Sequence, residues 1–240
     1  MQDIIFHDTW RWPIANSPDL LTLKEITLSI PPPNTSLSDT VIWRNSNEHT
    51  YSTKNAWNQI REVKSKVDWC TLVWFNGCLP KAAFFLWLAV KKKLGTQDSI
   101  RNIQSTALCL FCGREIETHS HLFFQCSFSM QVWRCVLQKG SFSAPSLPWD
   151  DLITWIVNNW NGQSLTIKAK KLCLATTVYT LWRDKNDRYH NNSVSRAEHI
   201  ASSIIGQVRL KLSTYTRIVD NTPNRLCQAV WSLPISIFGV

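Results

Sequence analysis

The chain has 240 residues, which is long enough for one or two domains with a substantial core. Its thirteen tryptophans and ten phenylalanines exclude a disordered protein. The formal net charge of +9 favours an acidic partner such as nucleic acid. The longest apolar run, Ala82 to Val90, has nine residues, whereas roughly 20 are needed to cross a membrane. No signal peptide is recognisable, since Asp3 and His7 interrupt any apolar run, so we expect an intracellular protein of the nucleus or cytoplasm rather than a secreted one.

The first segment, residues 1–38, is rich in proline. Pro13, Pro18 and the run at 31–33 favour extended backbone and interrupt regular elements. We therefore predict an extended, largely irregular lead-in before the first domain.

Residues 39–140 are predicted to form a mainly helical domain with a small hairpin. The hairpin would pair residues 41–43 with 49–52. Pro80 is expected to begin a helix that runs through Val90 and is apolar on nearly all faces, which indicates a central place in the core. Further short helices or helical turns are predicted after Ser52, near Trp69, after Thr96 and after Ser127.

A cysteine and histidine cluster lies near the end of this domain. Cys109 and Cys112 form a C-x2-C pair, and His121 and Cys126 follow at short spacing. A C-x2-C pair directs two thiolates at one metal ion, and a further His and Cys complete a tetrahedral shell. Four protein ligands leave no position open for a substrate, so the pattern predicts a structural rather than a catalytic zinc.

Two nearby side chains compete for a place in this shell. His121 is four residues away from Cys126 and is followed by an apolar run, so we favour it as the ligand. His119 would leave a looser gap of six residues and is assigned a supporting or exposed position. Glu117 is not expected to bind, because three thiolates and an imidazole already fill the shell. The alternative interpretation of the cluster is a set of buried reduced thiols.

Positive charge is concentrated before the cysteines. Residues 1–40 contain two basic and five acidic side chains, whereas residues 41–108 contain ten basic and four acidic ones. A basic surface beside a zinc module is typical of a nucleic-acid-binding protein. The alternative is that the lysines at 91–93 only complement the dipole at the end of a helix. The candidate nucleic-acid contacts are Lys64, Lys66, Lys81, Lys91, Lys92, Lys93 and Arg101.

The character of the chain changes near Gly140 to Pro148, where we predict a domain boundary. Residues 145–240 should form a C-terminal helical bundle or flap with three amphipathic helices, at 149–160, 165–188 and 195–219. Ser195 and Glu198 match a capping box at the start of the third helix. Aromatic residues at helical spacing here are interpreted as core. Three cations lie at the end of the middle helix, namely Arg183, Lys185 and Arg188. They either form a second basic site or only complement the dipole at the end of that helix.

The order of the aromatic, proline and metal-binding residues resembles that of one known family. The segments that carry the resemblance are Trp10-x-Trp12-Pro13, Asp39-x3-Trp43-Arg44, Tyr51-Ser52-x-Lys54-x-Ala56-Trp57, Trp69-x3-Val73-Trp74, Leu79-Pro80-Lys81-x3-Phe85-x-Trp87-Leu88, Leu94-x-Thr96-x-Asp98, Glu117-Thr118, His121-Leu122-Phe123, Cys126-x-Phe128-Ser129, Val132-Trp133 and Tyr179-x2-Trp182-Arg183-Asp184-Lys185-Asn186-x-Arg188. The family is the zinc-binding domain that follows the reverse transcriptase in plant non-LTR (LINE-type) retrotransposon polyproteins. The glycine usual before Tyr51 is replaced around His49 and Thr50, so we expect an altered turn there.

The catalytic motifs of such polyproteins are not present in the sequence. No aromatic-x-Asp-Asp segment occurs, and the adjacent Asp150 and Asp151 are interpreted as a helix start. Neither a nucleophile elbow nor a glycine-rich phosphate loop is found. The resemblance therefore implies a non-catalytic zinc module that binds RNA or DNA, with a reverse transcriptase or polyprotein segment as a further partner and neither a membrane nor a small-molecule substrate. The alternatives are a zinc scaffold for protein contacts and a hydrolase or transferase whose site has no recognisable motif.

Overall fold

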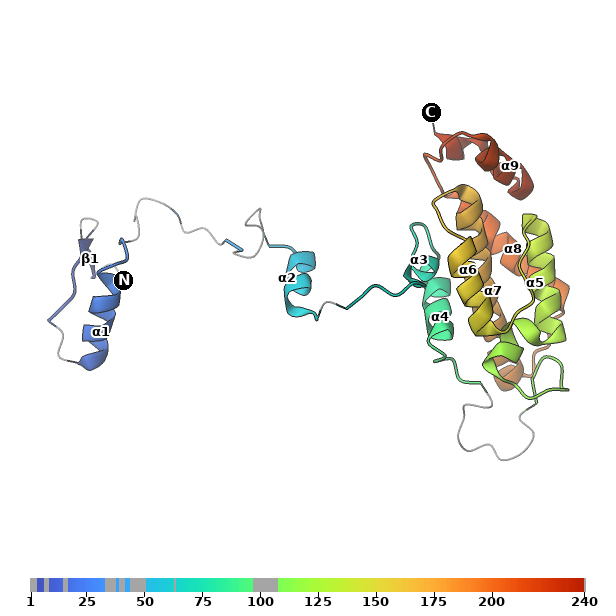
Figure 1. Cartoon of the computed structure of the whole chain (residues 1–240), viewed down its shortest axis with the longest axis horizontal. Coiled ribbons are helices and arrows are strands. Elements are labelled where there is room, and N and C mark those ends of the chain that lie inside the picture. The colour runs from blue at the N-terminus through green and yellow to red at the C-terminus, as the bar shows by residue number, and fades with distance from the viewer. Residues whose placement is uncertain are drawn as a thin grey trace. The chain divides into compact units, whose positions relative to one another are not determined.

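The computed structural model divides into two compact units, residues 1–65 and residues 66–240 (Figure 1). The residues that it describes are 4–6, 9–14, 17–32, 38, 42–43, 51–62, 64–96 and 108–239. Of the predicted hairpin, the structure describes residues 42–43 and 51–52, and none of these four lies in a strand. The predicted short helix after Thr96 lies outside the described residues. Each unit is described by itself below.

The first unit contains a helix where the sequence predicts an irregular lead-in. Ser17 caps helix α1 (Pro18–Thr27) by accepting a hydrogen bond from the Leu20 amide, and Pro18 occupies the first turn. The prediction was wrong here because a proline at the first helical position is already suited to a helix and costs no hydrogen bond. Ahead of α1, strand β1 (Ile5–Phe6) pairs antiparallel with β2 (Thr9–Trp10).

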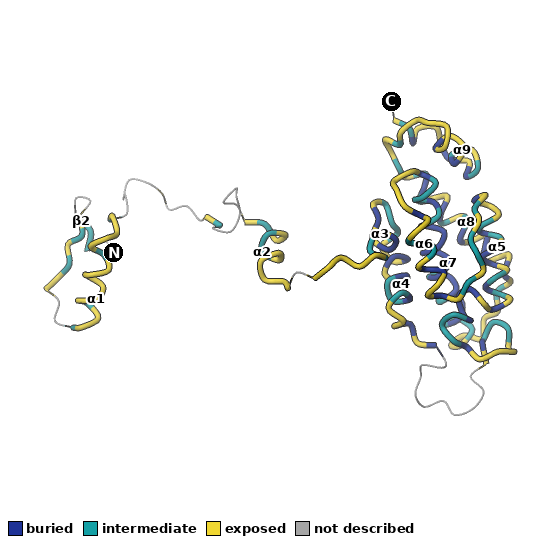
Figure 2. Tube along the Cα trace, viewed as in Figure 1, coloured by how far each residue is buried: buried dark blue, intermediate teal, exposed yellow. Residues whose placement is uncertain are grey.

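The second helix of this unit, α2 (Thr53–Ile60), begins as predicted at Ser52. The Ser52 hydroxyl accepts a hydrogen bond from the Asn55 amide at 3.1 Å. Neither α1 nor α2 contains a buried residue, and both are largely exposed in Figure 2. The first unit therefore has no hydrophobic core among its described residues.

The second unit is mainly α-helical, as predicted. Pro80 begins an apolar helix as expected, and the short turn near Trp69 is also present. The elements are α3 (Cys70–Val73), α4 (Pro80–Val90), the π-helix η2 (His121–Gln125), α5 (Ser127–Gly140), α6 (Trp149–Asn159), α7 (Leu165–Asn191), α8 (Ala197–Ser213), α9 (Thr222–Trp231) and the 3₁₀-helix η3 (Ile235–Phe238). Among the described residues, no helix is both long enough and apolar enough to span a membrane.

Helix α7 is the centre of this unit. Helices α3, α4, α5, α8 and α9 all pack against it, and Figure 2 shows it buried along most of its length. The sequence predicts one apolar face on α7, whereas Cys173, Leu174 and Thr176 on other faces are also fully buried. A helix surrounded by neighbours has few positions left for solvent, and this widens the buried surface beyond a single stripe.

The predicted boundary at 140–148 lies inside the second unit rather than between domains. Helix α5 packs against α7 and α8, and α6 begins with Trp149, which is 1% exposed. The Trp149 ring contacts the Phe123 and Phe124 rings of η2 at 5.3 and 5.7 Å. The cysteine segment and the C-terminal helices therefore share one core, which the change in composition does not reveal.

The last predicted helix is shorter than expected and lacks its predicted cap. Helix α8 ends at Ser213, and Arg196 occupies its N-cap position without a side-chain hydrogen bond. The capping box does not form, because Glu198 accepts a hydrogen bond from Gln131 of α5 at 2.6 Å. Helix α9, which was not predicted, begins at Thr222 and is capped by Asn221, whose side chain accepts a hydrogen bond from the Asn224 amide.

Candidate metal centre

Four predicted ligands come together in the second unit. The ligand atoms of Cys109, Cys112, His121 and Cys126 all lie within 4.8 Å of one another. Cys109 Sγ is 3.9 Å from Cys126 Sγ, and Cys112 Sγ is 3.3 Å from His121 Nε2. A tetrahedral zinc would separate two sulfurs by about 3.8 Å and a sulfur from an imidazole nitrogen by about 3.5 Å. The arrangement therefore fits a structural zinc with three sulfur ligands and one nitrogen ligand.

The first two ligands are held by a tight backbone turn. The Cys109 amide donates to the Glu115 carbonyl at 2.8 Å, and the Gly113 amide donates to the Cys109 carbonyl at 2.8 Å. Gly113 has a φ of +63°, a left-handed conformation that glycine adopts without strain. Leu108 and Ile116 close the base of the turn as an isolated β-bridge. This geometry brings both thiols of the C-x2-C pair to the same side of the turn.

The other two ligands are joined by the π-helix η2. The Cys126 amide donates to the His121 carbonyl at 2.7 Å, a bond across five residues rather than four. This wider turn brings His121 and Cys126 to one side of the chain. The residues between them include Leu122 and Phe123, which are fully buried in the core. The apolar run after His121 thus anchors this half of the site, as the sequence indicates.

Cys126 is well placed to act as an anionic sulfur. It occupies the N-cap position of α5, where backbone amides and the helix dipole favour negative charge. The hydrogen bond from Cys109 lowers the pKa of the Cys126 thiol to about 5, and the Ser129 and Phe128 amides act in the same direction. The same hydrogen bond, in which Cys109 donates its proton, raises the pKa of the Cys109 thiol together with burial. Zinc would replace that proton and hold both sulfurs as thiolates.

Glu115 supports His121 in a way that the sequence reasoning missed. Its carboxylate lies 3.1 Å from His121 Nδ1, which directs Nε2 toward the sulfurs. A carboxylate on the far nitrogen of a zinc-binding histidine fixes the ring and strengthens it as a ligand. The Glu115 side chain is 72% exposed, so the partner is held at the rim of the site. The sequence signal that could have identified Glu115 is its position within the turn that follows Cys112.

His119 and Glu117 both lie outside the ligand set. The His119 ring packs edge-on against Trp149 at 4.5 Å and against Phe123 at 5.0 Å, so it belongs to the aromatic core. It is half-buried rather than exposed. Glu117 is fully buried and forms an ion pair with Lys185 Nζ at 3.0 Å. The structure thus assigns both residues to packing around the site.

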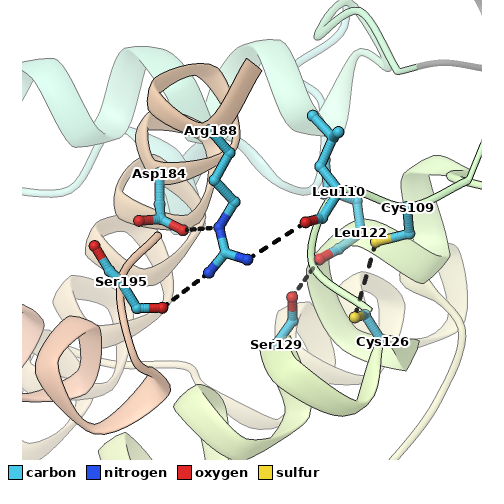
Figure 3. A network of polar contacts seen from close by, with 8 residues as sticks. All are labelled: Cys109, Leu110, Leu122, Cys126, Ser129, Asp184, Arg188 and Ser195. Atoms are coloured by element: carbon cyan, nitrogen blue, oxygen red, sulfur yellow. Dashed lines mark hydrogen bonds and ion pairs between the residues drawn. The ribbon is translucent and has the colours of Figure 1, made fainter. Parts of the chain in front are cut away.

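Arg188 at the end of α7 connects the metal-binding turn to the helical core (Figure 3). Its guanidinium donates to Asp184 at 2.7 Å, to the Ser195 carbonyl at 2.9 Å and to the Leu110 carbonyl at 3.3 Å. The same group lies against both the Phe111 and Phe128 rings, at 4.7 and 4.5 Å from their centres, and these two rings contact each other at 4.8 Å. Leu110 and Phe111 are the two residues between Cys109 and Cys112. Arg188 therefore has a structural role in the second unit.

Lys185 forms a second link of the same kind. In addition to Glu117, its ammonium donates to the Gly95 carbonyl at 2.8 Å, just beyond the end of α4, and lies over the Trp182 ring. Of the three cations predicted at the end of the middle helix, only Arg183 is exposed. Two of the three are therefore structural rather than part of a second basic surface.

The predicted nucleic-acid contacts belong to both units, and those of the second unit that flank α4 lie at its two ends. Lys64 belongs to the first unit and pairs with Glu62 at 3.3 Å, whereas Lys66 begins the second unit. Lys81 lies in the first turn of α4, while the lysines at 91–93 follow its last residue, about 15 Å away along the helix. All of these lysines are exposed. Arg101 lies outside the described residues.

One lysine at the end of α4 already has a protein partner. Lys92 forms an ion pair with Asp150 at 2.6 Å. It adopts a positive φ of +51°, which ends the helix. The helix-end interpretation therefore applies to Lys92 itself, whereas Lys91 and Lys93 extend from the same turn with exposed side chains.

Comparison with known proteins supports the metal centre. The sequence model of a family described as zinc-binding in reverse transcriptase matches residues 51–133. No curated protein and no solved structure matches the chain. The matched segment includes α4, both halves of the metal centre and the first turns of α5. Residues 51–133 are therefore similar to a zinc-binding region of reverse transcriptases, and the three cysteines and one histidine within them form a structural zinc site.

Proposed function

We propose that the protein is a non-catalytic zinc module that binds RNA or DNA without sequence preference beside a reverse transcriptase. The observation that carries the proposal is the closed set of four ligands inside a segment that matches a reverse-transcriptase zinc-binding family. We further propose that the module derives from a plant LINE-type polyprotein and acts inside the cell. The order of the tryptophans, Pro80 and the ligands supports this origin.

The exposed lysines in and just after α4 supply the proposed contacts. Lys81, Lys91 and Lys93 are exposed, and α4 itself contains no acidic residue. Lysine ammonium groups bind phosphates as point charges, which gives affinity but no reading of base sequence. The zinc would hold the neighbouring turn in place and would leave no ligand position for a reactant. In this function the protein therefore contributes positive charge that binds phosphates and a fold that holds this charge in position.

The test is a binding assay of zinc-loaded protein with single-stranded RNA, single-stranded DNA and duplex DNA across a salt series. Neutralising Lys81, Lys91 and Lys93 to glutamine should weaken binding to all three nucleic acids and reduce the salt slope by about 2 to 3. Lys92 is left unchanged because its ion pair with Asp150 has a structural role.

The matched control neutralises three arginines at positions distant from α4 in the sequence. Arg196, Arg209 and Arg217 are exposed residues in or beside α8. Helices α4 and α8 pack on α7, and α4 lies at the left of this unit in the view of Figure 1. If the control loses as much affinity as the lysine variant, only net charge matters and the proposed surface is wrong. The absence of salt-dependent binding by the unchanged protein would reject the function as a whole.

A zinc scaffold for protein contacts is the second candidate. It is favoured by α1, in which no residue is buried while Leu21, Leu23 and Ile26 are each about half exposed. Apolar side chains on one short helix are typical of a surface that packs on a partner protein. Binding to a reverse transcriptase that α1 substitutions abolish, combined with no nucleic-acid binding, would favour this candidate.

A further inference from the structure

A partly exposed aromatic face lies where α4 packs on α7. We define this aromatic face as Phe84, Phe85 and Trp87 of α4 together with Tyr179 of α7. Phe84 contacts Phe85 and Trp87 at ring-centre distances of 5.9 and 5.7 Å, and Phe85 contacts Tyr179 at 5.1 Å. Phe84 is 46% exposed, although its ring contacts two other aromatic rings.

Two cations border this aromatic face. Lys81 Nζ lies 5.3 Å from the centre of the Tyr179 ring, and the Arg183 guanidinium lies 5.7 Å from the same ring. Cation–π attraction keeps both positive groups next to the aromatic rings instead of leaving them to sample the solvent freely. Lys81 and Arg183 are exposed, so their charge is available to a ligand.

The combination of an exposed ring and bordering cations fits one class of partner. We propose that the aromatic face binds single-stranded nucleic acid, with a base stacked on Phe84 and the adjoining phosphates on Lys81 and Arg183. Stacking requires an unpaired base whose flat side is free, and duplexes keep those surfaces inside the helix. The two cations beside the Tyr179 ring distinguish this face from a purely apolar docking surface, because they can bind phosphates while the exposed Phe84 ring offers a flat surface to a base.

This inference rests on the proposed function and adds that the nucleic acid bound at this surface is single-stranded. Lys81 belongs to the proposed binding surface and also borders the aromatic face. Arg183 was one of three cations considered for a second basic site, whereas Phe84 and Tyr179 were not predicted as nucleic-acid contacts. The sequence places Phe84 inside an apolar helix, which was expected to be buried on nearly all faces. Its exposure became visible only in the structure, because α7 packs on α4 without covering Phe84, which is 46% exposed.

The experiment compares Phe84→Leu with the unchanged protein, both zinc-loaded, on oligouridine, oligodeoxythymidine and a mixed-sequence DNA duplex. Leucine keeps the apolar bulk and the helix but removes the ring. Loss of one stacked base should weaken binding of both single strands about 5- to 150-fold and leave duplex binding unchanged. Phe84→Trp should restore single-strand binding, and Arg183→Gln should weaken it with a smaller salt slope.

The control variant is Trp74→Leu, which removes an equally exposed aromatic ring at the end of α3. Trp74 is 47% exposed, and it is separate from the aromatic face as defined above. We expect it to bind every nucleic acid as the unchanged protein does. Zinc content and thermal unfolding of each variant would show that the fold is intact.

The possible outcomes separate the two proposals. If Phe84→Leu binds single strands normally while neutralisation of Lys81, Lys91 and Lys93 weakens binding, the stacking inference is overturned and the proposed function stands. An equal loss on duplex and single strands would also reject stacking. If the unchanged protein binds no nucleic acid at all, both proposals fail together.

Discussion

Replacing Arg188 with methionine should destabilise the second unit more than any exposed substitution. The Arg188 and Asp184 side chains are 7% and 8% exposed, so methionine would leave a nearly buried carboxylate without its cation. Removing one partner of a buried ion pair lowers the free energy of unfolding by about 3 to 5 kcal/mol. For a unit of this size, the corresponding fall in the unfolding temperature is about 6 to 20 °C.

A double-mutant cycle tests whether the carboxylate is the cause. Asp184→Asn together with Arg188→Met removes both charges, so the double variant should lose less stability than the sum of the two single variants. The remaining loss would reflect the hydrogen bonds to Leu110 and Ser195. Thermal and urea unfolding of the zinc-loaded variants are the measurements.

The matched control is Arg209→Met on α8. Arg209 is exposed and makes one hydrogen bond of 3.4 Å, to the Ser232 carbonyl. Substitutions of this kind usually change stability by less than about 0.5 kcal/mol. If Arg188→Met costs no more than this control, or if the two single changes add without coupling, the assignment of Arg188 as a buried structural link is refuted.

Three further predictions concern the metal. Glu115→Gln should keep one zinc but lower its affinity about 10- to 100-fold, because the carboxylate orients His121; unchanged affinity in a chelator competition would contradict this. His119→Ala should retain zinc and His121→Ala should lose it, as measured by metal analysis; the reverse result would reassign the ligand. Chelation should first raise hydrogen exchange in residues 108–126, and uniform unfolding of the whole unit would refute a local role of the metal.

The ligand set could be predicted because metal chemistry constrains short stretches of sequence. The C-x2-C pair and the spacing from His121 to Cys126 specify ligand types and chain reach, and both depend on local backbone only. The π-helix between His121 and Cys126 leaves no comparable signal, because it differs from an α-helix by one hydrogen-bond register. The four ligands could thus be predicted from the sequence, whereas the π-helix that joins two of them could not.

The packing of the second unit could be predicted only in part. Helix positions follow from apolar spacing and from caps such as Pro80, which act within one turn. The predicted boundary near residues 140–148 failed because loop composition does not show which core the next helix joins. Trp149 enters the core of the metal-binding segment across a long-range contact. The roles of Lys185 and Arg188 depended on similar long-range contacts, so charge alone could not distinguish them from a binding surface.

The zinc and the proposed binding surface are connected through the fold. Zinc would hold the segment that contains Glu117, Glu117 pairs with Lys185, and Lys185 binds the Gly95 carbonyl just after the lysines at 91–93. Phe84 lies within α4 about two turns before these lysines, and the position of this helix is set by packing on α7 rather than by this link. Loss of zinc should therefore weaken the salt-dependent part of nucleic-acid binding that the lysines supply. The stacking contribution of Phe84 should change less, because the helix that presents it is held by the hydrophobic core.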